Sequence, residues 1–191
     1  MNLETFVIGN LEKFFLRKRN KAMKESKADL VMILNTDIEV SNIDLAVKLF
    51  EEDQKLFAVT FSPEFSQLKT VEKTDFANGG SSIYRRKIWN KIGGIDLMFE
   101  PYWWDDVDYS FRAKKMGYKI LKDSRVKVVK KSELGTDILN RNPYSKFIYY
   151  RNYFLFLRKN KPKKFLEKFN NPLDWPLLLL AEIRYRKFYS L

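Results

Sequence analysis

The chain has 191 residues, 45% of them hydrophobic and 16% aromatic, which is enough for a domain with a real core and argues against disorder. Cysteine and histidine are both absent, so disulfides, thiolate catalysis and cysteine-based zinc sites are excluded. Any acid–base or metal chemistry must rest on carboxylates, Lys or Tyr. No apolar run approaches the roughly 18 residues of a membrane-spanning helix. The N-terminus has no basic start before an apolar stretch, so we expect a cytoplasmic protein without a secretory signal.

The net charge of +12 is concentrated in the C-terminal part of the chain. Residues 1–110 hold 15 Lys and Arg against 18 Asp and Glu, whereas residues 111–191 hold 21 against 6. Such asymmetry suggests an anionic partner, for which nucleic acid, an anionic membrane face and a phosphate-bearing substrate are candidates. A lysine-rich solvated surface explains the same numbers equally well.

The first part of the chain alternates between strand-like and helix-like segments. Strands are expected at 5–9, 29–34 and 57–61, and helices at 11–27 and 42–54. The near-continuous apolar run at 29–34 fits a buried strand of a parallel sheet. The alternation predicts an α/β layered domain.

The later elements follow the same pattern. Residues 62–76 are expected to be irregular, followed by a strand at 82–84, a short helix at 85–92, a helix that runs to about 116 and strands at 118–121 and 126–129. From residue 143 the sequence becomes basic and aromatic at helical spacing, with a last helix near Trp175-Pro176. We therefore expect a core at 1–140 and a helical tail at 141–191, packed on the core or on a membrane surface.

Two groups of polar residues are candidates for chemistry. Asn35-Thr36-Asp37 follows a buried strand, and active sites of open α/β sheets lie outside the carboxyl ends of strands. Asp37 and Asn35 offer the oxygen ligands that a hard cation on a diphosphate needs, although a plain polar turn fits as well. Asn78-Gly79-Gly80 permits close backbone approach to a ligand, or simply a turn.

A third group, Asp105, Asp106 and Asp108, lies behind a Pro-aromatic run and ahead of a basic helix. Helix capping and dipole compensation explain one or two of these carboxylates. A third leaves room for a general base that accepts a hydroxyl proton. Arg112 lies four residues after Asp108, so a structural ion pair between them is expected.

Taken in order, these pieces resemble the family 2 glycosyltransferases, which have the GT-A fold. That family has an "RN.G" helix, a strand that ends in an "NPD" or "NTD" triplet, a glycine turn and a "GGFDE" turn. The corresponding residues here are Arg19-Asn20, Asn35-Thr36-Asp37, Gly79-Gly80 and Gly93-Gly94-Ile95-Asp96.

The family pattern "F.PaYwEDvDLslRlrraGYki" comes next. The positions in register with it are Phe99, Pro101, Tyr102, Trp104, Asp105, Asp106, Asp108, Arg112, Gly117 and Tyr118. The segment YYRNYFLFLRK also resembles a "yyRNrl.f.rk" helix that is common after the catalytic domain. The resemblance covers roughly residues 6–160.

The resemblance implies a truncated Rossmann-like GT-A sheet and a set of site residues. Asp37, with Asn35, would lie near Mg²⁺ or Mn²⁺ and the donor diphosphate, where the cation would offset charge on the leaving group. Asp106 would be the catalytic base, and Asp105 replaces the usual Glu beside it. The residues that would contact substrate are Arg19, Asn20, Gly79, Gly80, Trp103, Trp104 and Lys130. The two tryptophans would stack on a sugar ring.

The chain departs from the family pattern in two places. Members open with a "vsiiivtyn" strand and further elements that hold the nucleotide base, and Met1 falls beyond these. We therefore expect an N-terminally truncated chain: a fragment, half of a split gene, a degenerate copy, or a protein completed by a partner chain. Many members also carry a histidine after the last strand, and Lys130 or Lys131 occupies that place here. A lysine would neutralise phosphate charge instead of binding metal.

The resemblance thus implies a metal-dependent transferase that moves a sugar, with inversion, from a nucleotide-sugar to a polysaccharide, lipid-linked or glycoprotein acceptor, as in cell-wall or polysaccharide biosynthesis. The basic tail would hold it at the inner face of an anionic membrane. The alternatives are an inactive or split-gene fragment that acts only with a partner chain, and a basic nucleic-acid-binding module. A homo-oligomer is also possible. The donor sugar, its base and the acceptor stay open.

Overall fold

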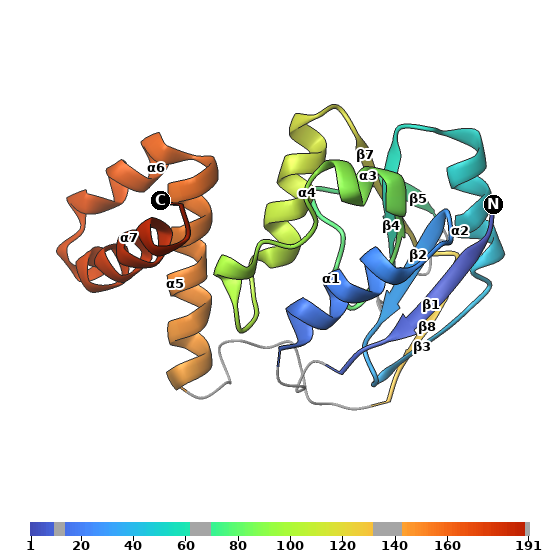
Figure 1. The fold of residues 1–191 in the computed structure, drawn as a ribbon, viewed down its shortest axis with the longest axis horizontal. Helices are drawn as coiled ribbons and strands as arrows, with labels where there is room; N and C mark the ends of the chain where they lie inside the picture. Colours follow the sequence, from blue (N-terminus) through green and yellow to red (C-terminus); the bar gives the residue numbers. More distant parts are fainter. Residues whose placement is uncertain (10–13, 62–69, 132–142, 190–191) are drawn as a thin grey trace.

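A computed structural model describes residues 1–9, 14–61, 70–131 and 143–189 (Figure 1). The strands are β1 (Leu3–Val7), β2 (Leu30–Leu34), β3 (Ile38–Ser41), β4 (Leu56–Thr60), β5 (Val71–Lys73), β6 (Ser81–Arg85), β7 (Lys119–Asp123) and β8 (Lys127–Lys130). The core helices are α1 (Phe15–Glu25), α2 (Asp44–Glu52), α3 (Arg86–Lys91) and α4 (Asp105–Lys115). The tail helices are α5 (Pro143–Asn160), α6 (Pro162–Glu167) and α7 (Trp175–Tyr189), with short 3-10 turns η1 (Leu97–Phe99), η3 (Lys168–Asn170) and η4 (Pro172–Asp174).

The central sheet mixes parallel and antiparallel pairs. Its six strands lie in the order β1-β2-β6-β4-β7-β5. The pairs β1–β2 and β4–β7 are parallel, and the other neighbours are antiparallel. β3 and β8 form a separate antiparallel ribbon. The mixed α/β architecture expected from the sequence is therefore confirmed.

Strand β2 shows how the apolar runs build two cores. All five of its residues are buried, and they alternate between the faces of the sheet. Val31 and Ile33 join the core that includes α1, α3, α4 and the tail helices. Leu30, Met32 and Leu34 join the core under α2 and the β3–β8 ribbon. A strand covered on both faces must be apolar throughout, which explains the run in the sequence.

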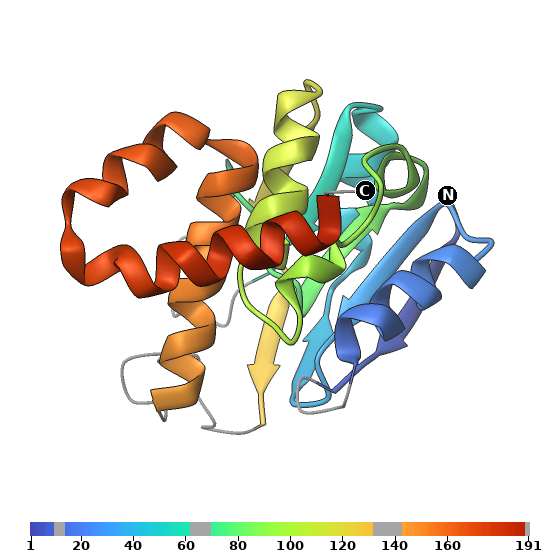
Figure 2. The ribbon, with the colours of Figure 1, turned by 60° about the vertical axis from the view of Figure 1, so that its left-hand side comes forward.

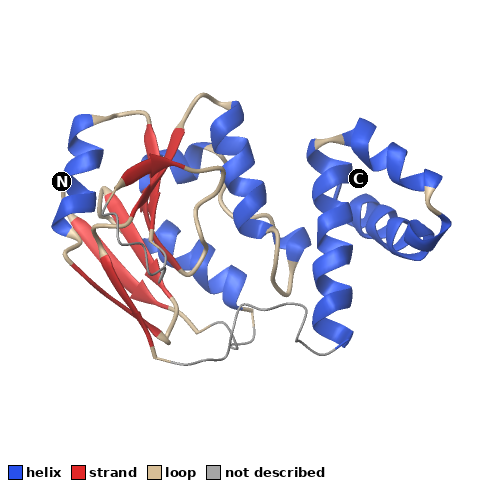
Figure 3. Cartoon of the chain, turned by 180° about the vertical axis from the view of Figure 1, so that it is seen from behind, coloured by secondary structure: helices blue, strands red, loops and turns tan. Residues whose placement is uncertain are grey.

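The helical tail packs beside the core in two steps. Helix α5 stands next to α4, and α6 and α7 lie on the side of α5 that faces away from the sheet (Figures 1 and 3). Helix α7 crosses α5, and its C-terminal end returns to the core (Figure 2). Tail residues such as Ile148, Leu155 and Leu178 belong to the same apolar cluster as core residues. The tail therefore shares its interior with the core.

Most expected elements form, with their ends shifted by a few residues. Two strands escaped the sequence analysis. Segment 62–76 was expected to be irregular, yet its described part contains β5, which pairs with β7. β3 directly follows the Asn35–Asp37 turn and pairs with β8. Both are short and only partly buried, so neither has the apolar pattern that marks an interior strand. Among the helices of the described residues, none has the length and apolar character to cross a bilayer.

Candidate active site

The candidate site lies at one end of two central strands. β2 ends at Leu34, and the following Asn35 donates its backbone N–H to the Gly80 carbonyl at 2.8 Å. Gly79 and Gly80 directly precede β6, which runs antiparallel to β2. The end of β2 and the start of β6 therefore lie at the same end of the sheet. Residues 35 and 79–80 are neighbours there, although they are distant in sequence. The α4 N-terminus and α1 bring the remaining groups to the same place.

Arg19 on α1 links these segments. Its side chain is only 6% exposed, and it donates to the Asn35 amide oxygen at 3.0 Å. Its other terminal nitrogen lies 3.9 Å from an Asp105 carboxylate oxygen. The guanidinium also lies over the Phe15 ring, 4.7 Å from the ring centre. Arg19 is thus a buried cation that bonds to Asn35 and offsets the charge of Asp105, and its expected contact with a substrate stays a prediction.

The two glycines make room for this pair of side chains. A Cβ on Gly79 would lie 2.7 Å from an Arg19 terminal nitrogen, and a Cβ on Gly80 would lie 2.1 Å from the Asn35 amide nitrogen. Any side chain at Gly80 would therefore displace Asn35. The groups that closely approach the backbone of Gly79 and Gly80 in the structure are the protein's own Arg19 and Asn35 side chains.

Asp105 and Asp106 occupy the first turn of α4, where the helix dipole favours negative charge. Burial raises the pKa of Asp105 to about 7, with a further contribution from the charge of Asp106, while Arg19 opposes the shift. Burial also raises the pKa of Asp106, and the backbone N–H groups of Val107 and Gly79 oppose that shift. Asp105 is buried and Asp106 is half-buried, so Asp106 is the more accessible of the two. A carboxylate with a raised pKa in such a setting suits general-base chemistry.

Asp108 has a different environment, although it is only two residues away. It is fully buried and accepts from Arg112 at 2.9 Å, from Lys159 at 3.0 Å and from Asn160 at 2.8 Å. The predicted Asp108–Arg112 pair is therefore confirmed. Lys159 also pairs with Asp96 at 2.7 Å. Asp108 fastens α4 to the tail helix α5 and takes no part in the candidate site.

The Pro-aromatic loop before α4 is held by one side chain of α5. Asn152 is fully buried, and its amide nitrogen donates to the carbonyls of Phe99 at 2.6 Å, Tyr102 at 2.7 Å and Trp103 at 3.1 Å. Arg151 adds a bond of 2.6 Å to the Glu100 carbonyl. The position of the acidic pair at the end of this loop therefore depends on the tail.

The two tryptophans of the loop are packed unequally. The Trp104 ring lies against three rings of α5, at 5.6 Å from Tyr149, 4.9 Å from Tyr153 and 5.4 Å from Phe156. Trp103 has an edge contact with Tyr149 at 6.1 Å. Trp104 thus has more ring contacts with α5 than Trp103, which also lies against Tyr102 at 5.8 Å.

Asn20, the neighbour of Arg19, has a structural role. Its amide nitrogen donates to the Ile95 carbonyl at 2.8 Å, and its amide oxygen accepts from the Ile95 N–H at 2.9 Å. Both ends of the side chain are therefore engaged with the turn at Gly93–Asp96. The expected contact between Asn20 and substrate stays a prediction.

Asp37 lies in the turn that joins β2 to β3, next to the lysines that end β8. The Lys131 N–H donates to the Asp37 carbonyl at 2.8 Å, and Lys130 pairs with Ile38 in the ribbon. The Lys131 ammonium is 2.5 Å from Glu39. Within the described part of the chain, Lys130 has no ion-pair partner. The structure therefore brings the two lysines that were candidates for the histidine position close to Asp37, and Lys130 is the one whose charge is not paired.

The donor set for a divalent cation fits only in part. Among the described residues there is no group of three or more carboxylates that could hold a metal ion. The Asn35 amide oxygen is engaged by a cationic guanidinium, so Asn35 is a poor metal ligand here. The Asp37 carboxylate is half-buried at the strand end, and it alone of the predicted pair keeps the right chemistry for a hard cation.

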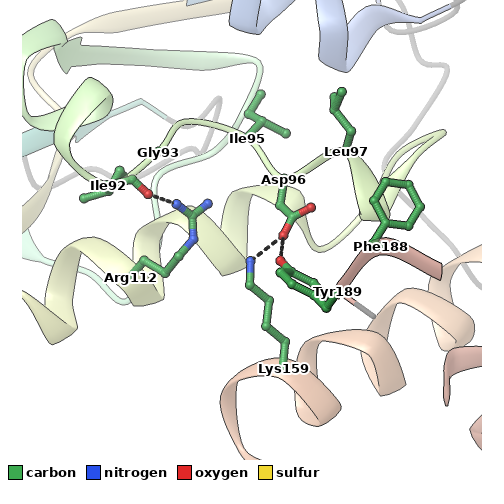
Figure 4. A pocket seen from close by; sticks show the side chains of 9 residues that line it. All are labelled: Ile92, Gly93, Ile95, Asp96, Leu97, Arg112, Lys159, Phe188 and Tyr189. Atoms are coloured by element: carbon green, nitrogen blue, oxygen red, sulfur yellow. Dashed lines mark hydrogen bonds and ion pairs between the residues drawn. The ribbon is translucent and has the colours of Figure 1, made fainter. Parts of the chain in front are cut away.

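Two hollows of the surface lie away from the acidic pair. One, of about 520 Å³, is lined by the Gly93–Asp96 turn, Arg112, Lys159 and the end of α7 (Figure 4). Inside it, Lys159 and Tyr189 both bond to the Asp96 carboxylate. A second, of about 500 Å³, lies between β1, β2 and the β3–β8 ribbon. Neither includes Asp105 or Asp106.

Comparison with solved structures shows a GT-A-like fold. No protein-family model and no curated protein sequence match the chain. A solved structure of GalNAc-T7 with UDP, GalNAc and Mn²⁺ matches 93% of this chain with a TM-score of 0.62 and 13% identity. The mannosyltransferase PcManGT from Pyrobaculum calidifontis, solved with GDP-Man and Mn²⁺, matches 91% with a TM-score of 0.53 and 18% identity. The chain spans 43% and 53% of those two proteins. The GT-A-like fold expected from the sequence is confirmed.

The sequence analysis missed the residues that support the site from the tail. Asn152, Lys159 and Asn160 were seen only as parts of a basic aromatic helix. The sequence does contain a signal for Asn152, which is a polar residue within the aromatic run YYRNYFLFL. A polar side chain that is buried among aromatic rings is expected to form hydrogen bonds. Which carbonyls it bonds cannot be read from a linear sequence.

Proposed function

We propose that the chain is the catalytic part of an inverting glycosyltransferase similar to family 2, which uses a nucleotide-sugar donor. The observation that supports this most is the convergence of Arg19, Asn35, Gly79–Gly80 and the Asp105–Asp106 pair at one edge of a GT-A-type sheet. A structural sheet needs no buried, mutually repelling carboxylates at its edge, because they cost stability. The two solved neighbours bind UDP with GalNAc and GDP-Man, each with Mn²⁺.

In this proposal Asp106 is the general base. It accepts the proton of an acceptor hydroxyl, and the hydroxyl oxygen attacks the anomeric carbon of the donor. The bond from that carbon to the diphosphate oxygen breaks on the opposite side, so the configuration inverts. Burial keeps the pKa of Asp106 raised, and the positive charge of Arg19 limits that rise. Trp103 provides an apolar face for a saccharide.

The donor phosphates are assigned to the edge near Asp37. Asp37 would hold Mg²⁺ or Mn²⁺, which neutralises the charge of the departing nucleoside diphosphate. Lys130, whose ammonium is unpaired within the described residues, would add positive charge beside the phosphates. The acceptor is a polysaccharide, lipid-linked or glycoprotein hydroxyl.

One observation favours a second version of this function. The chain spans about half the length of the two solved proteins it resembles, and Val7 on the edge strand β1 is 59% exposed. In this version the site is completed by another chain, and the protein alone is inactive. Nucleic-acid binding ranks below both versions, because it gives the Asp105–Asp106 pair no role.

Calorimetry with UDP and GDP separates these versions. The transferase proposal expects Mn²⁺-dependent binding by the chain alone, which Asp37→Ala abolishes, while Asp75→Asn, at an exposed carboxylate, leaves it unchanged. Asp106→Asn should retain nucleotide binding and abolish sugar transfer. Absence of nucleotide binding, or binding that Asp37→Ala does not weaken, would contradict an independently active enzyme.

A further inference from the structure

Large apolar side chains are exposed in the α6–α7 hairpin far more than in the rest of the molecule. We define six of them as the tail ridge. Its members and their exposed fractions are Leu166 (65%), Phe169 (43%), Leu173 (86%), Trp175 (54%), Leu179 (61%) and Ile183 (56%). Single exposed apolar residues are ordinary on protein surfaces, but a concentration of this kind marks an interaction site.

The ridge is an ordered feature of the hairpin. Trp175, Leu179 and Ile183 recur every four residues and so share one face of α7, whereas Leu178 and Ala181 on the opposite face are fully buried. The Trp175 indole N–H donates to the Phe169 carbonyl at 2.9 Å, which ties the start of α7 to η3. Helix α7 thus carries apolar residues on two faces, of which one is buried and the other is exposed.

The charges around the ridge identify its partner. Residues 161–189 carry seven Lys and Arg against three acidic residues. Lys163, Lys164 and Lys187 are exposed and have no ion-pair partner within the part of the chain that the structure describes. A second copy of the chain would bring the same positive charges together, which disfavours self-association through this face. An anionic lipid surface matches both the apolar residues and the lysines.

We propose that the tail ridge inserts into the interfacial layer of an anionic bilayer, with Lys163, Lys164 and Lys187 on the lipid phosphates. Trp175 and Phe169 suit the headgroup depth, where aromatic rings are favoured. The inference goes beyond the proposed transferase function and does not depend on it. Since α5 carries both the hairpin and Asn152, docking through the ridge would fix the position of the Pro-aromatic loop relative to the lipid.

The test is co-sedimentation of the full chain with two kinds of vesicle, phosphatidylcholine alone and phosphatidylcholine mixed with phosphatidylserine. We expect binding to the anionic vesicles that weakens as salt is raised, together with a blue shift of Trp175 fluorescence. Leu173→Ser with Leu179→Ser should reduce the partition coefficient by roughly tenfold or more. Both side chains are so exposed that the fold should not change.

Matched variants test whether the tail lysines and the tail ridge are the groups that contact the lipid. Lys163→Glu with Lys164→Glu should reduce binding to anionic vesicles by roughly tenfold or more, whereas Lys24→Glu with Lys27→Glu on the core should not. Met116→Ser, at an exposed apolar residue far from the tail in sequence, is the control for the serine variant. No binding by the parent chain, or equal binding by the ridge variants, would overturn the proposal. So would concentration-dependent dimerisation that the serine variant abolishes.

Discussion

The carboxylates on the two sides of the first turn of α4 have opposite surroundings. On one side Asp108 is surrounded by Arg112, Lys159 and Asn160, which satisfy its charge completely. On the other side Asp105 and Asp106 share one incompletely bonded cation, and burial raises the pKa of both. Three aspartates within four residues are therefore one structural anchor and one pair that we propose to be reactive. The contacts of each carboxylate in a compact acidic cluster therefore need to be examined separately before any of them is assigned to catalysis.

Removal of the anchor is expected to have the largest effect on stability. Asp108→Ala would leave Arg112 and Lys159 without their buried counter-charge, which costs about 3–5 kcal/mol of unfolding free energy. Urea unfolding measures this cost. As a control, Asp75→Ala breaks an exposed pair with Lys114 and should change stability by less than about 1 kcal/mol. Equal effects of the two variants would show that Asp108 is not an anchor.

The reactive pair should make stability depend on pH in a definite direction. Burial raises the pKa of Asp105 in the folded state to about 7, well above its ordinary value, so folding favours the protonated form. This stabilisation is complete below about pH 4 and is lost as pH rises through about 7. The unfolding free energy should therefore fall by roughly 3–4 kcal/mol between pH 4 and pH 8.

Asp105→Asn should reduce that pH dependence and stabilise the protein at pH 8, and Asp106, whose pKa burial also raises, contributes the part that remains. Asp96, whose pKa is lowered mainly through the charge of Lys159 against the effect of burial, acts in the opposite direction. Its contribution is present above its ordinary pKa and is lost only as pH falls below it, so it does not mask the change near pH 7. A pH profile identical for parent and variant would refute the raised pKa of Asp105.

Loss of Asn152 is expected to have an intermediate effect. Asn152→Ala leaves three carbonyls of the Pro-aromatic loop without their donor, at a cost of about 1–3 kcal/mol. The emission spectra of Trp103 and Trp104 should shift, because the loop that carries them loosens. The surface variant Asn90→Ala is the control and should change neither quantity. An unchanged spectrum would mean that other contacts hold the loop.

The smallest effect on stability is expected for the proposed base. Asp106→Asn removes a carboxylate that burial already disfavours, so unfolding free energy should change by less than about 1 kcal/mol. Transfer activity should fall by about 10²–10⁴-fold if Asp106 accepts the proton. Steady-state kinetics with a nucleotide-sugar donor measure this fall. An unchanged kcat in the variant would show that Asp106 is not the general base.

Sequence patterns predicted the fold well where they reflected burial. The runs at 29–34 and 57–61 form interior strands because each is covered on both faces, and β2 and β4 are fully buried. The convergence of Arg19, Asn35, Gly79–Gly80 and Asp105 agrees with the expected placement at a strand edge. The edge strand β5 was missed, because a short, exposed strand has no apolar signature.

The direction of individual side chains could not be predicted. Arg19 and Asn20 are adjacent, yet one reaches the acidic pair and the other bonds to Ile95. Successive residues of a helix point about 100° apart, so neighbours in a motif serve different places. Likewise the motif gave Trp103 and Trp104 one role, whereas packing against α5 separates them.

The hydrogen bonds from Asn152 to the Pro-aromatic loop have a practical consequence for the design of a shorter version of this protein. A cut near residue 140 looks attractive, because the α/β part and the helical part differ so clearly in composition. Such a cut would strip the loop of its amide donor and open the apolar interior that Leu155 and Leu178 help to fill. The smallest piece expected to remain soluble and well ordered therefore includes α5, and domain-swapping experiments should exchange both parts together.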